Sequence, residues 1–376
     1  MSLTAWSFPT RILFGNGAVR ELGKRSLELG DKALIVTDAG VVKAGILDAV
    51  KKSLDEAGVA HATFDGVHPN PYEDDVTAGV ARYRESGASF IIAVGGGSPL
   101  DVGKLVRLMV THEPPIAQYD DAIGGDAKVV HPVPPMIAVP TTAGTGSEVG
   151  RSGVVTVRAT GRKTVIFAPR LLANLAILDP ELTVGMPPPM TAATGFDALT
   201  HCLEAWLSVG DHPMADAIAL GGLELVAKHL LPATRDGKDL GARGGMMKAA
   251  AMGAVAFQKG LGACHSLAHP LSSEKGLHHG LANALCLPAV VAWNAEAVPE
   301  RVERAARIFG VAGPELPNAL RKLSKDLGLP EGLRAEGVTE ADLDKLADLA
   351  VQDACHTSNP RPCTRDDLRR LYQQSL

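Results

Sequence analysis

The sequence predicts two domains, an α/β N-terminal domain built on a parallel sheet followed by an all-α C-terminal domain. The chain has 376 residues, whereas a single hydrophobic core rarely grows beyond roughly 250 to 300 residues. Short apolar runs alternate with helical patterns in the first half, and the later segments are long and rich in Ala and Leu. The character changes at MPPPM (186–190), so we expect domains over 1–187 and 188–376.

The alternation in the first half is typical of βαβ units. Strands that are buried on both faces read as continuous apolar runs. We therefore expect strands and helices in turn over KALIVTD (32–38), VVKAGILDAVKKSLDEAG (41–58), HATFDGV (61–67), YEDDVTAGVARYRESG (72–87) and SFIIAV (89–94). Further strands are expected within 135–142, 152–157, 164–169 and 174–180.

The second half carries apolar residues at helical spacing and almost no β-branched alternation, so it predicts helices only. The clearest segments are 191–210, 212–231 and 281–298. Between them, GACHSLAHPLSSEKGLHHG (262–280) holds four of the chain's 12 histidines. Because proline lacks the backbone N–H of a helix, we expect a break at Pro270, a loop over 272–276 and a new helix after His278 and His279.

The composition argues against several kinds of partner. With 46% hydrophobic and 21% charged residues and a formal net charge of −5, the chain can bury a large core but has no basic field. No segment gathers Lys and Arg into a stripe, so we expect no nucleic-acid partner. The cysteines are odd in number and form no CxxC pair, which indicates cytosolic thiols; they are Cys202, Cys264, Cys286, Cys355 and Cys363.

The opening segment MSLTAWSFPTRI lacks the charged start and apolar core of a signal peptide. No apolar run approaches the ~20 residues that a spanning helix requires. We therefore expect a cytoplasmic protein that does not enter a membrane.

A glycine run follows one of the expected strands. In VGGGSPLDVGK (94–104), three glycines let the backbone approach a ligand, and the start of the next helix favours an anion such as a phosphate. A strand-to-helix turn without function also favours glycine. The run therefore leaves both a phosphate site and a plain turn open.

A second loop supports the phosphate site. PTTAGTGSEVG (140–150) also follows a buried strand and supplies hydroxyl groups from Thr141, Thr142, Thr145 and Ser147. Two such loops at the carboxyl ends of parallel strands form one crevice, where ligands of open α/β sheets bind. The pattern is not GxGxxG. Asp38 is positioned either to accept hydrogen bonds from a ribose and disfavour a 2′-phosphate, which would favour NAD over NADP, or to cap a helix.

The second half contains candidate metal ligands. Asp197 and His201 are four residues apart in an apolar helical segment, so both side chains leave the same face. Such a pair also occurs as an ordinary surface hydrogen bond. The histidines of 262–280 supply further ligands, but one ion cannot take all of them. A carboxylate with up to three imidazoles suits a divalent Lewis acid acting on an alcohol or carbonyl oxygen beside a nicotinamide.

The motifs together resemble the iron-containing (group III) alcohol dehydrogenases over nearly the whole chain. The resemblance rests on GGGSPLDVGK, PTTAGTGSEVG, LDPELT, GFDALTHCLEA and GACHSLAHPLSSEKGLHHGLANALCLP, which stand in the family's order. It implies a Rossmann-like N-terminal domain, a helical C-terminal domain and a homodimer. It also implies bound NAD and Fe²⁺, with Zn²⁺ as the alternative metal.

The resemblance assigns residues by position. It makes Asp197, His201, His265 and His279 the metal ligands, because the family's cluster histidines are fourteen residues apart and His278 would be off by one. It places His269 near the nicotinamide as a catalytic proton relay or substrate contact. The implied dinucleotide-binding residues are Asp38, Asn70, Gly96, Gly97, Ser98, Thr141, Thr142, Thr145 and Lys163. The implied reaction is hydride transfer between C4 of the nicotinamide and a carbinol carbon.

The substrate implied is a small primary alcohol or aldehyde. FQKGLGACHSLAHPL with LHHG, and ATRDGKDLGAR, are most similar to the 4-hydroxybutyrate dehydrogenases of the family, whereas LANAL and the short SSEKG loop look like general alcohol members. Arg151 is a candidate partner of a substrate carboxylate, or a surface or phosphate contact.

Three other readings remain open. Zinc-dependent glycerol dehydrogenases and dehydroquinate synthases share this two-domain frame, as the resemblance also implies. A synthase pocket would need several basic residues, whereas the stretch KGLGACHSLAHPLSSEKG (259–276) offers only Lys259 and Lys275. The last alternative is a nucleotide-binding protein without catalysis.

Overall fold

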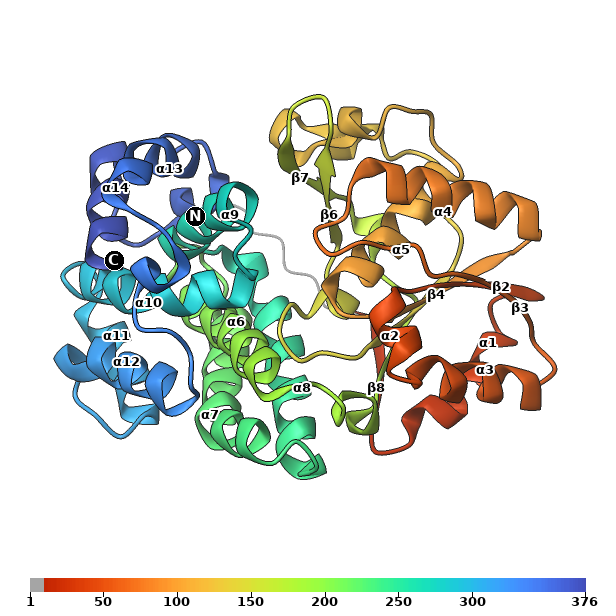
Figure 1. Cartoon of the computed structure of the whole chain (residues 1–376), viewed down its shortest axis with the longest axis horizontal. Coiled ribbons are helices and arrows are strands. Elements are labelled where there is room, and N and C mark those ends of the chain that lie inside the picture. Colours follow the sequence, from red (N-terminus) through yellow and green to blue (C-terminus); the bar gives the residue numbers. More distant parts are fainter. Residues whose placement is uncertain (1–9) are drawn as a thin grey trace. The chain divides into compact units, whose positions relative to one another are not determined.

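The computed structural model describes residues 10–376 and divides into two compact units (Figure 1). We call residues 10–142 and 146–185 the α/β unit, and residues 143–145 and 186–376 the helical unit. Most of the opening segment considered for a signal peptide, residues 1–9, lies outside the described residues.

The α/β unit contains a six-stranded parallel sheet, which confirms the predicted fold class. The strand order is β1-β8-β5-β4-β2-β3, and every pairing is parallel. The strands are β1 (Arg11–Phe14), β2 (Lys32–Val36), β3 (Ala60–Phe64), β4 (Phe90–Gly95), β5 (Met136–Pro140) and β8 (Leu175–Leu178). Strand β1 was not among the predicted strands. It is a short, mostly exposed edge strand and therefore has no buried apolar run.

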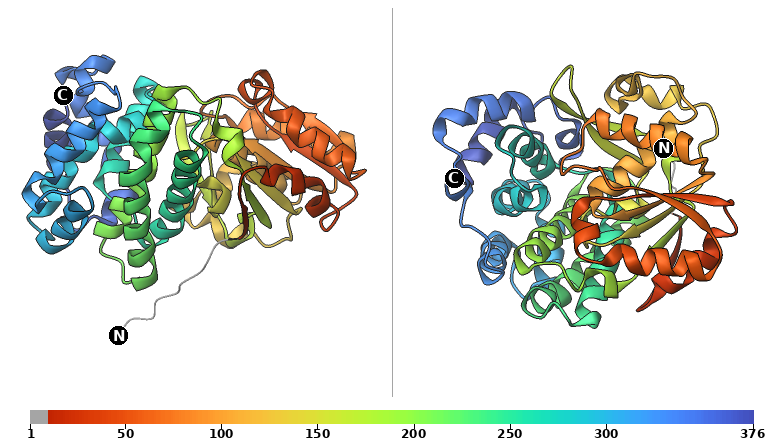
Figure 2. Two further views of the ribbon diagram at one scale, coloured as in Figure 1. Left: turned by 90° about the horizontal axis from the view of Figure 1, so that it is seen from below. Right: turned by 45° about the vertical axis from the view of Figure 1, so that its right-hand side comes forward.

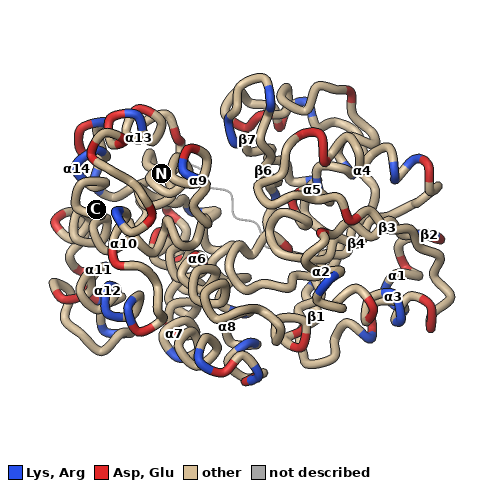
Figure 3. The backbone as a smooth tube through the Cα atoms, viewed as in Figure 1, with Lys and Arg blue, Asp and Glu red and all other residues tan. Residues whose placement is uncertain are grey.

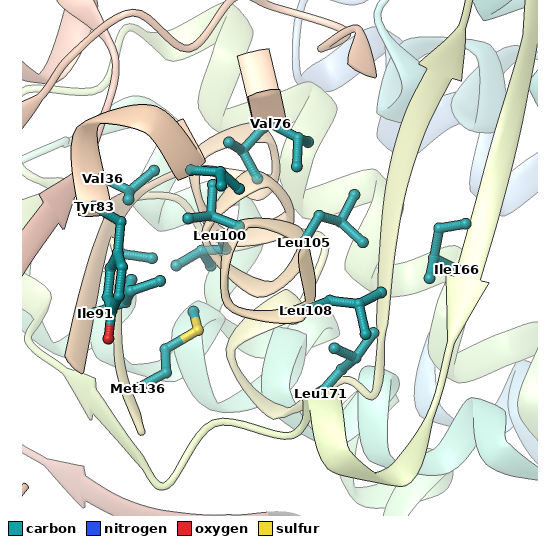
Figure 4. Packing of buried hydrophobic residues seen from close by; sticks show 14 of the residues in the cluster. Val36, Val76, Tyr83, Ile91, Leu100, Leu105, Leu108, Met136, Ile166 and Leu171 are labelled. Carbon is teal, nitrogen blue, oxygen red and sulfur yellow. The ribbon is translucent and has the colours of Figure 1, made fainter. Parts of the chain in front are cut away.

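Helices cover both faces of this sheet (Figures 1 and 2). They are α1 (Leu22–Ser26), α2 (Ala39–Lys43), α3 (Ile46–Glu56), α4 (Glu73–Ser86) and α5 (Gly97–Met109). Along β2, Leu34 and Val36 join the core under α4 and α5, shown in Figure 4, whereas Ala33 and Ile35 join the core under α1 and α3. This alternation is expected of a strand buried on both faces.

Two predicted features of the α/β unit differ from the structure. The single helix expected over 41–58 is divided into α2 and α3 at Gly45, whose φ of +71° a helix does not allow. The strands expected near 152–157 and 164–169 are β6 (Ser152–Val157) and β7 (Arg162–Phe167), which form an antiparallel hairpin apart from the sheet. Buried and less buried residues alternate along β6, as in a strand packed on one face.

All regular elements of the helical unit's described residues are helices, as predicted. They are α6 (Pro188–Leu207), α7 (Pro213–Arg235), α8 (Leu240–Ala256), α9 (Ala263–Lys275), α10 (His279–Ala295), α11 (Pro299–Ile308), α12 (Leu316–Asp326), α13 (Leu343–Ala350) and α14 (Arg365–Gln374). Helix α6 packs against α7, α8 and α10, which buries most of its residues.

Short 3-10 helices complete both units. They are Ala18–Glu21, Ile116–Tyr119, Asp121–Ile123, Gly125–Lys128, Ser147–Val149, Pro169–Leu171, Pro180–Thr183, Phe257–Lys259, Gly313–Glu315, Leu333–Glu336, Glu340–Asp342 and Ala354–Ser358.

Helix α9 continues through Pro270, so the expected break at this residue is wrong. The helix ends at Gly276, which has a φ of +69°, and the loop expected over 272–276 is mostly its last turn. Pro270 removes only the hydrogen bond that its own nitrogen would donate. Leu267 and Leu271 on either side are fully buried, and their burial stabilises the helix across the proline. The left-handed glycine is what ends it.

Charged residues of both signs are interspersed along the two units (Figure 3). In the described part of the chain, no helix combines the length and apolarity needed to cross a membrane.

Candidate active site

Asp197 and His201 lie one turn apart on α6, and both are buried. Nε2 of His201 is 3.8 Å from Oδ1 of Asp197. This separation is too long for a hydrogen bond. The surface-pair alternative is therefore wrong, because the two side chains neither face solvent nor bond to each other.

Two further histidines approach the same carboxylate oxygen. Nε2 of His265, on α9, is 4.0 Å from Oδ1 of Asp197, and Nε2 of His279, at the start of α10, is 3.5 Å from it. Because metal–nitrogen and metal–oxygen bonds are each about 2.0–2.2 Å long, one ion can contact a pair of atoms at these separations. Donor atoms of Asp197, His265 and His279 all lie within 4.8 Å of one another. His201 is outside that trio, but its ring stacks on His265 with centroids 4.8 Å apart.

A buried glutamate, which the sequence analysis did not single out, orients His265. Oε2 of Glu204 lies 2.6 Å from Nδ1 of His265, and Oε1 accepts a 2.7 Å hydrogen bond from the backbone N–H of Cys264. Burial raises the pKa of Glu204 to about 7, although backbone hydrogen bonds act in the opposite direction. A carboxylate behind a histidine is the usual support of a metal ligand. Its sequence signal is spacing, since Asp197, His201 and Glu204 recur at i, i+4 and i+7.

Asn283 is a second residue that the sequence analysis missed. It is fully buried one turn after His279 on α10. Its amide nitrogen donates to Oδ1 of Asp197 at 2.9 Å and lies 3.3 Å from Nε2 of His279. Asn283 thus links the α6 carboxylate to the α10 histidine.

The electrostatics of this cluster suit a cation. Burial alone would raise the pKa of Asp197, but the charges of neighbouring histidines, above all His201 and His279, hold it below its ordinary value. Burial and the charge of His201 hold the pKa of His265 well below its ordinary value. The carboxylate is therefore ionised and this imidazole neutral, as metal ligands must be.

Two buried nitrogens of the cluster also lack partners. Nε2 of His265 and Nδ1 of His201 have no hydrogen-bond partner among the described residues. A buried polar atom without a partner is costly, and a bound ion would satisfy Nε2 of His265. The donor set therefore fits one divalent ion with nitrogen and oxygen ligands.

His269 and His278 do not belong to the group of histidines around Oδ1 of Asp197. Nδ1 of His269 is 2.7 Å from Oδ2 of Asp353, and its ring stacks on that of His279 with centroids 5.2 Å apart. His269 is thus beside the candidate metal cluster, in contact with a predicted ligand. His278 is an exposed residue at the N-cap of α10.

The structure brings the two predicted phosphate loops together. β4 and β5 are neighbours, and the N–H of Thr141 donates to the carbonyl of Gly95 at 2.9 Å. A Cβ atom on Gly96 would lie 3.3 Å from the methyl group of Thr142. Gly96 is the N-cap of α5, and Gly97 and Ser98 lie in its first turn. Among the described residues, no side chain caps this terminus. A glycine turn next to an uncapped helix N-terminus suits a phosphate.

Asp38 follows β2, and the loop of Gly95 follows β4. The sheet order reverses between these strands, since β3 lies on one side of β2 and β4 on the other. Such a switch point is where nucleotides bind in α/β sheets. Asp38 also caps α2, since it accepts a 2.9 Å hydrogen bond from the N–H of Val41. Its other oxygen, Oδ2, would lie 3.4 Å from a Cβ atom on Gly95.

The remaining predicted nucleotide residues fall in two places. Nζ of Lys163, on β7, donates a 2.7 Å hydrogen bond to Oδ1 of Asn70. The structure thus brings together two predicted residues that are distant in the sequence. Asn70 has a left-handed φ of 50°, and burial lowers the pKa of Lys163. Thr145 groups with the helical unit instead.

Lys104 anchors the second loop to α5, which the sequence analysis did not foresee. Its fully buried ammonium donates to Oγ of Ser147 and to the carbonyl of Ser152, both at 2.7 Å. Ser147 in turn donates to Oδ1 of Asp101 at 2.6 Å. These contacts fix the loop after β5 relative to the glycine turn after β4.

The basic residues considered for substrate binding have different surroundings. The guanidinium of Arg151 lies 5.3 Å from the centre of the Phe167 ring and forms no ion pair with a described residue. Lys259 pairs with Asp216, and Lys275 pairs with Asp342. Both lysines weighed for a synthase-type pocket are thus engaged within the helical unit.

Comparisons with known proteins identify the family to which the chain belongs. The family model "Iron-containing alcohol dehydrogenase" matches residues 9–180, and the model "Fe-containing alcohol dehydrogenase family, C-terminal" matches residues 191–376. A 4-hydroxybutyrate dehydrogenase of Cupriavidus necator is 43% identical over 98% of this chain and 98% of its own length. An NAD-dependent methanol dehydrogenase of Bacillus methanolicus is 35% identical over 100% of both chains.

A solved structure of a 1,3-propanediol oxidoreductase has a TM-score of 0.95 at 38% identity, with 100% of both chains covered. The resemblance expected from the motifs is confirmed. The chain belongs to the iron-containing alcohol dehydrogenase family and is an oxidoreductase.

Proposed function

We propose that this protein is a metal-dependent NAD(H) alcohol dehydrogenase and aldehyde reductase whose substrate pair is 4-hydroxybutyrate and succinic semialdehyde. The observation that carries the proposal is the buried cluster of Asp197, His201 and His265, completed by His279. Within residues 10–376, Nε2 of His265 has no hydrogen-bond partner. Glu204 and Asn283 support this cluster as orienting residues. We assign Fe²⁺ as the ion, with Zn²⁺ as the alternative, since both accept imidazole and carboxylate ligands.

In the proposed site, one residue supplies negative charge to the ion and another orients a histidine ligand. Asp197 supplies the anionic ligand, and Glu204 holds the Nδ1–H of His265 so that Nε2 is directed toward Asp197. A divalent ion in this site supplies Lewis-acid polarisation of the substrate oxygen. His269, whose ring stacks on His279, is placed to pass a proton between that oxygen and solvent.

The loops of the α/β unit are proposed to hold NAD. The uncapped start of α5 and the glycine turn at Gly96 suit the pyrophosphate, together with Gly97, Ser98, Thr141, Thr142 and Thr145. Asp38 favours NAD over NADP, because its carboxylate would repel a 2′-phosphate. Asn70 and Lys163 form the polar pair on the hairpin side. One methanol dehydrogenase relative is itself described as NAD-dependent.

Two observations support a substrate that carries a carboxylate. The relative at 43% identity is a 4-hydroxybutyrate dehydrogenase, and Arg151 has no carboxylate partner among the described residues. Arg151 is therefore proposed to pair with the substrate carboxylate, worth about 1.5–3 kcal/mol for a charge-assisted bond.

The test compares succinic semialdehyde with an uncharged aldehyde of the same length. We expect kcat/KM to favour the semialdehyde at least tenfold, and Arg151→Gln to abolish the preference. Arg162→Gln is the matched control and should keep the preference, since Arg162 is an exposed arginine of the β6–β7 hairpin that follows Arg151. Equal kcat/KM values for the two aldehydes in the wild type would contradict the semialdehyde assignment and leave the general aldehyde reductase intact.

We also propose that the protein works as a homodimer in the cytoplasm. Support comes from the family resemblance and from the cysteines, all five of which are free thiols. Light scattering of the purified protein tests the dimer, which a monomeric mass would contradict. The domain boundary is proposed at residues 187 and 188, where α6 begins on consecutive prolines.

A further inference from the structure

Helix α9 carries two histidines whose rings are held in the same way. His265 and His269 are one turn apart, and each points Nδ1 at a carboxylate from another element. The distances are 2.6 Å to Glu204 of α6 and 2.7 Å to Asp353, which precedes the short helix Ala354–Ser358. Only His265 is among the proposed metal ligands, so the second carboxylate needs a different explanation.

Asp353 is fixed by its own hydrogen bonds. Oδ1 accepts from the hydroxyl of Ser266 at 2.7 Å and from the N–H of Cys355 at 2.9 Å. The hydroxyl of Ser266 in turn accepts from the N–H of His356 at 2.8 Å. Rotation of the carboxylate would break these bonds, so Oδ2 stays aimed at His269.

The carboxylate is ionised. Burial raises the pKa of Asp353, but the charge of His269 and the hydrogen bonds from His269, Cys355 and Ser266 together hold it well below its ordinary value. An ionised carboxylate only accepts hydrogen bonds, so Nδ1 of His269 must carry the proton. In the neutral ring Nε2 is then the acceptor.

The ring of His269 is also held on other sides. It stacks on His279 at an interplanar angle of 15°, and it meets the ring of His265 at 70° with centroids 5.9 Å apart. The side chain nevertheless keeps 31% of its surface exposed. The ring plane of His269 is therefore restrained, while part of its side chain stays open to solvent.

We propose that Asp353 is a positioning residue that holds His269 in its Nδ1–H tautomer, so that Nε2 is the atom that accepts the hydroxyl proton of the alcohol substrate. This inference rests on the proposed function and specifies which atom of its proton relay acts. Ser266 serves it indirectly, because it occupies the other oxygen of Asp353.

An alternative role for His269 and Asp353 is to hold a second metal ion together with Cys355. Donor atoms of His269, Asp353 and Cys355 lie within 4.8 Å of one another. The hydrogen bonds of Asp353 oppose this alternative. Oδ1 already accepts from two donors, and Oδ2 is 2.7 Å from Nδ1 of His269.

The decisive substitution is Asp353→Asn. Asparagine keeps the shape and can still cap the short helix, but its amide nitrogen would donate to Nδ1 and move the proton to Nε2. We expect kcat to fall about 10–100-fold, the usual cost of losing such a supporting carboxylate, with metal content and KM for NADH unchanged. In a His269→Ala background the same substitution should cause no further loss.

Asp342→Asn is the matched control. Asp342 also caps a short helix of the helical unit and also pairs with a basic side chain, Lys275. Its substitution should leave kcat unchanged. A loss as large as that of Asp353→Asn would show a general effect of removing a capping carboxylate and would overturn the proposal.

A spectroscopic measurement separates this inference from the proposed function. Nitrogen-15 shifts of the His269 ring, recorded on the zinc-loaded protein and assigned by their loss in His269→Ala, should report Nδ1–H in the wild type and Nε2–H in Asp353→Asn. Nε2–H in the wild type, additive losses of kcat in the double variant, or two tightly bound ions per chain would each overturn the proposal. A wild type with the Nδ1–H tautomer that reduces no aldehyde would contradict the proposed function alone.

Discussion

The four histidines within 262–280 are assigned separate tasks in the proposed function, because each has different partners. His265 is buried, with Glu204 behind Nδ1 and Asp197 in front of Nε2. His269 has Asp353 behind Nδ1 and a partly exposed ring. His279 faces Asp197, whereas the neighbouring His278 is exposed. We therefore base the proposed role of each histidine, ion binding or proton transfer, on the environment of its ring.

The neighbours at 278 and 279 give the sharpest test at the residue scale. We expect His279→Ala to lose metal binding and activity, since it removes a nitrogen 3.5 Å from Asp197. His278→Ala, the adjacent control, should keep both. Metal content of the purified variants, with kcat for aldehyde reduction, checks this prediction. Equal losses in the two variants would contradict the ligand assignment.

The metal cluster depends on how closely α6 and α10 approach. Gly280 follows His279 on α10, and a Cβ atom there would lie 2.0 Å from the carbonyl oxygen of Ala193 and 3.2 Å from Cβ of Asp197. Real Cβ atoms do not come so close, so glycine is required for this packing. The predicted ligands of two helices are thus brought together by a residue that is not itself a ligand.

We expect Gly280→Ala to push α10 away from α6, which would lower both metal affinity and stability by about 1–3 kcal/mol. Gly185→Ala is the control, because a Cβ atom there meets nothing within 4 Å. Chelator competition measures the metal affinity, and denaturant unfolding measures the stability. An unchanged affinity in Gly280→Ala would show that the helix contact does not position His279.

We expect the loop after β5 to make the stability of the α/β unit depend on pH. Burial raises the pKa of Glu148 from 4.5 to about 7, against the lowering effects of its own backbone and of Lys104. Between about pH 4.5 and 7 the folded state therefore binds more protons than the unfolded state, and the free energy of unfolding falls as pH rises.

Glu148→Gln should remove this dependence. Relative to the variant, the wild type should lose stability as pH rises from about 5 to 8, by at most about 3 kcal/mol. Thermal or denaturant unfolding of both proteins at several pH values measures the difference. Glu300→Gln, at an exposed position of α11, should run parallel to the wild type, and parallel behaviour of Glu148→Gln would contradict the prediction.

Across the whole molecule, local patterns predicted the two-part fold. Continuous apolar runs indicated a sheet covered on both faces, and the structure confirms it. The local patterns gave wrong helix boundaries where a single residue or tertiary packing determines where a helix ends. Gly45 divides a periodic segment, and buried neighbours carry α9 through Pro270. β1 was missed because its exposed side chains form no pattern.

Only those site residues that lie close together in the sequence could be predicted from a local pattern. Spacing within one helix suggested Asp197 and His201, but the choice of His279 over His278 came from the family resemblance. Glu204 and Asp353 contact histidines 61 and 84 residues away in the sequence. Only tertiary packing brings such partners together, so no local pattern marks Asp353.

In the proposed function, one ion held by Asp197, His201, His265 and His279 is required for NADH-dependent aldehyde reduction. The most direct measurement removes metal from the purified protein with a chelator and restores Fe²⁺ anaerobically, while metal content and NADH oxidation are followed in the same samples. Activity should disappear with the metal and return as a single equivalent per chain is restored. Full activity of the metal-free protein, or no NADH oxidation with any aldehyde after Fe²⁺ or Zn²⁺ is restored, would contradict the claim.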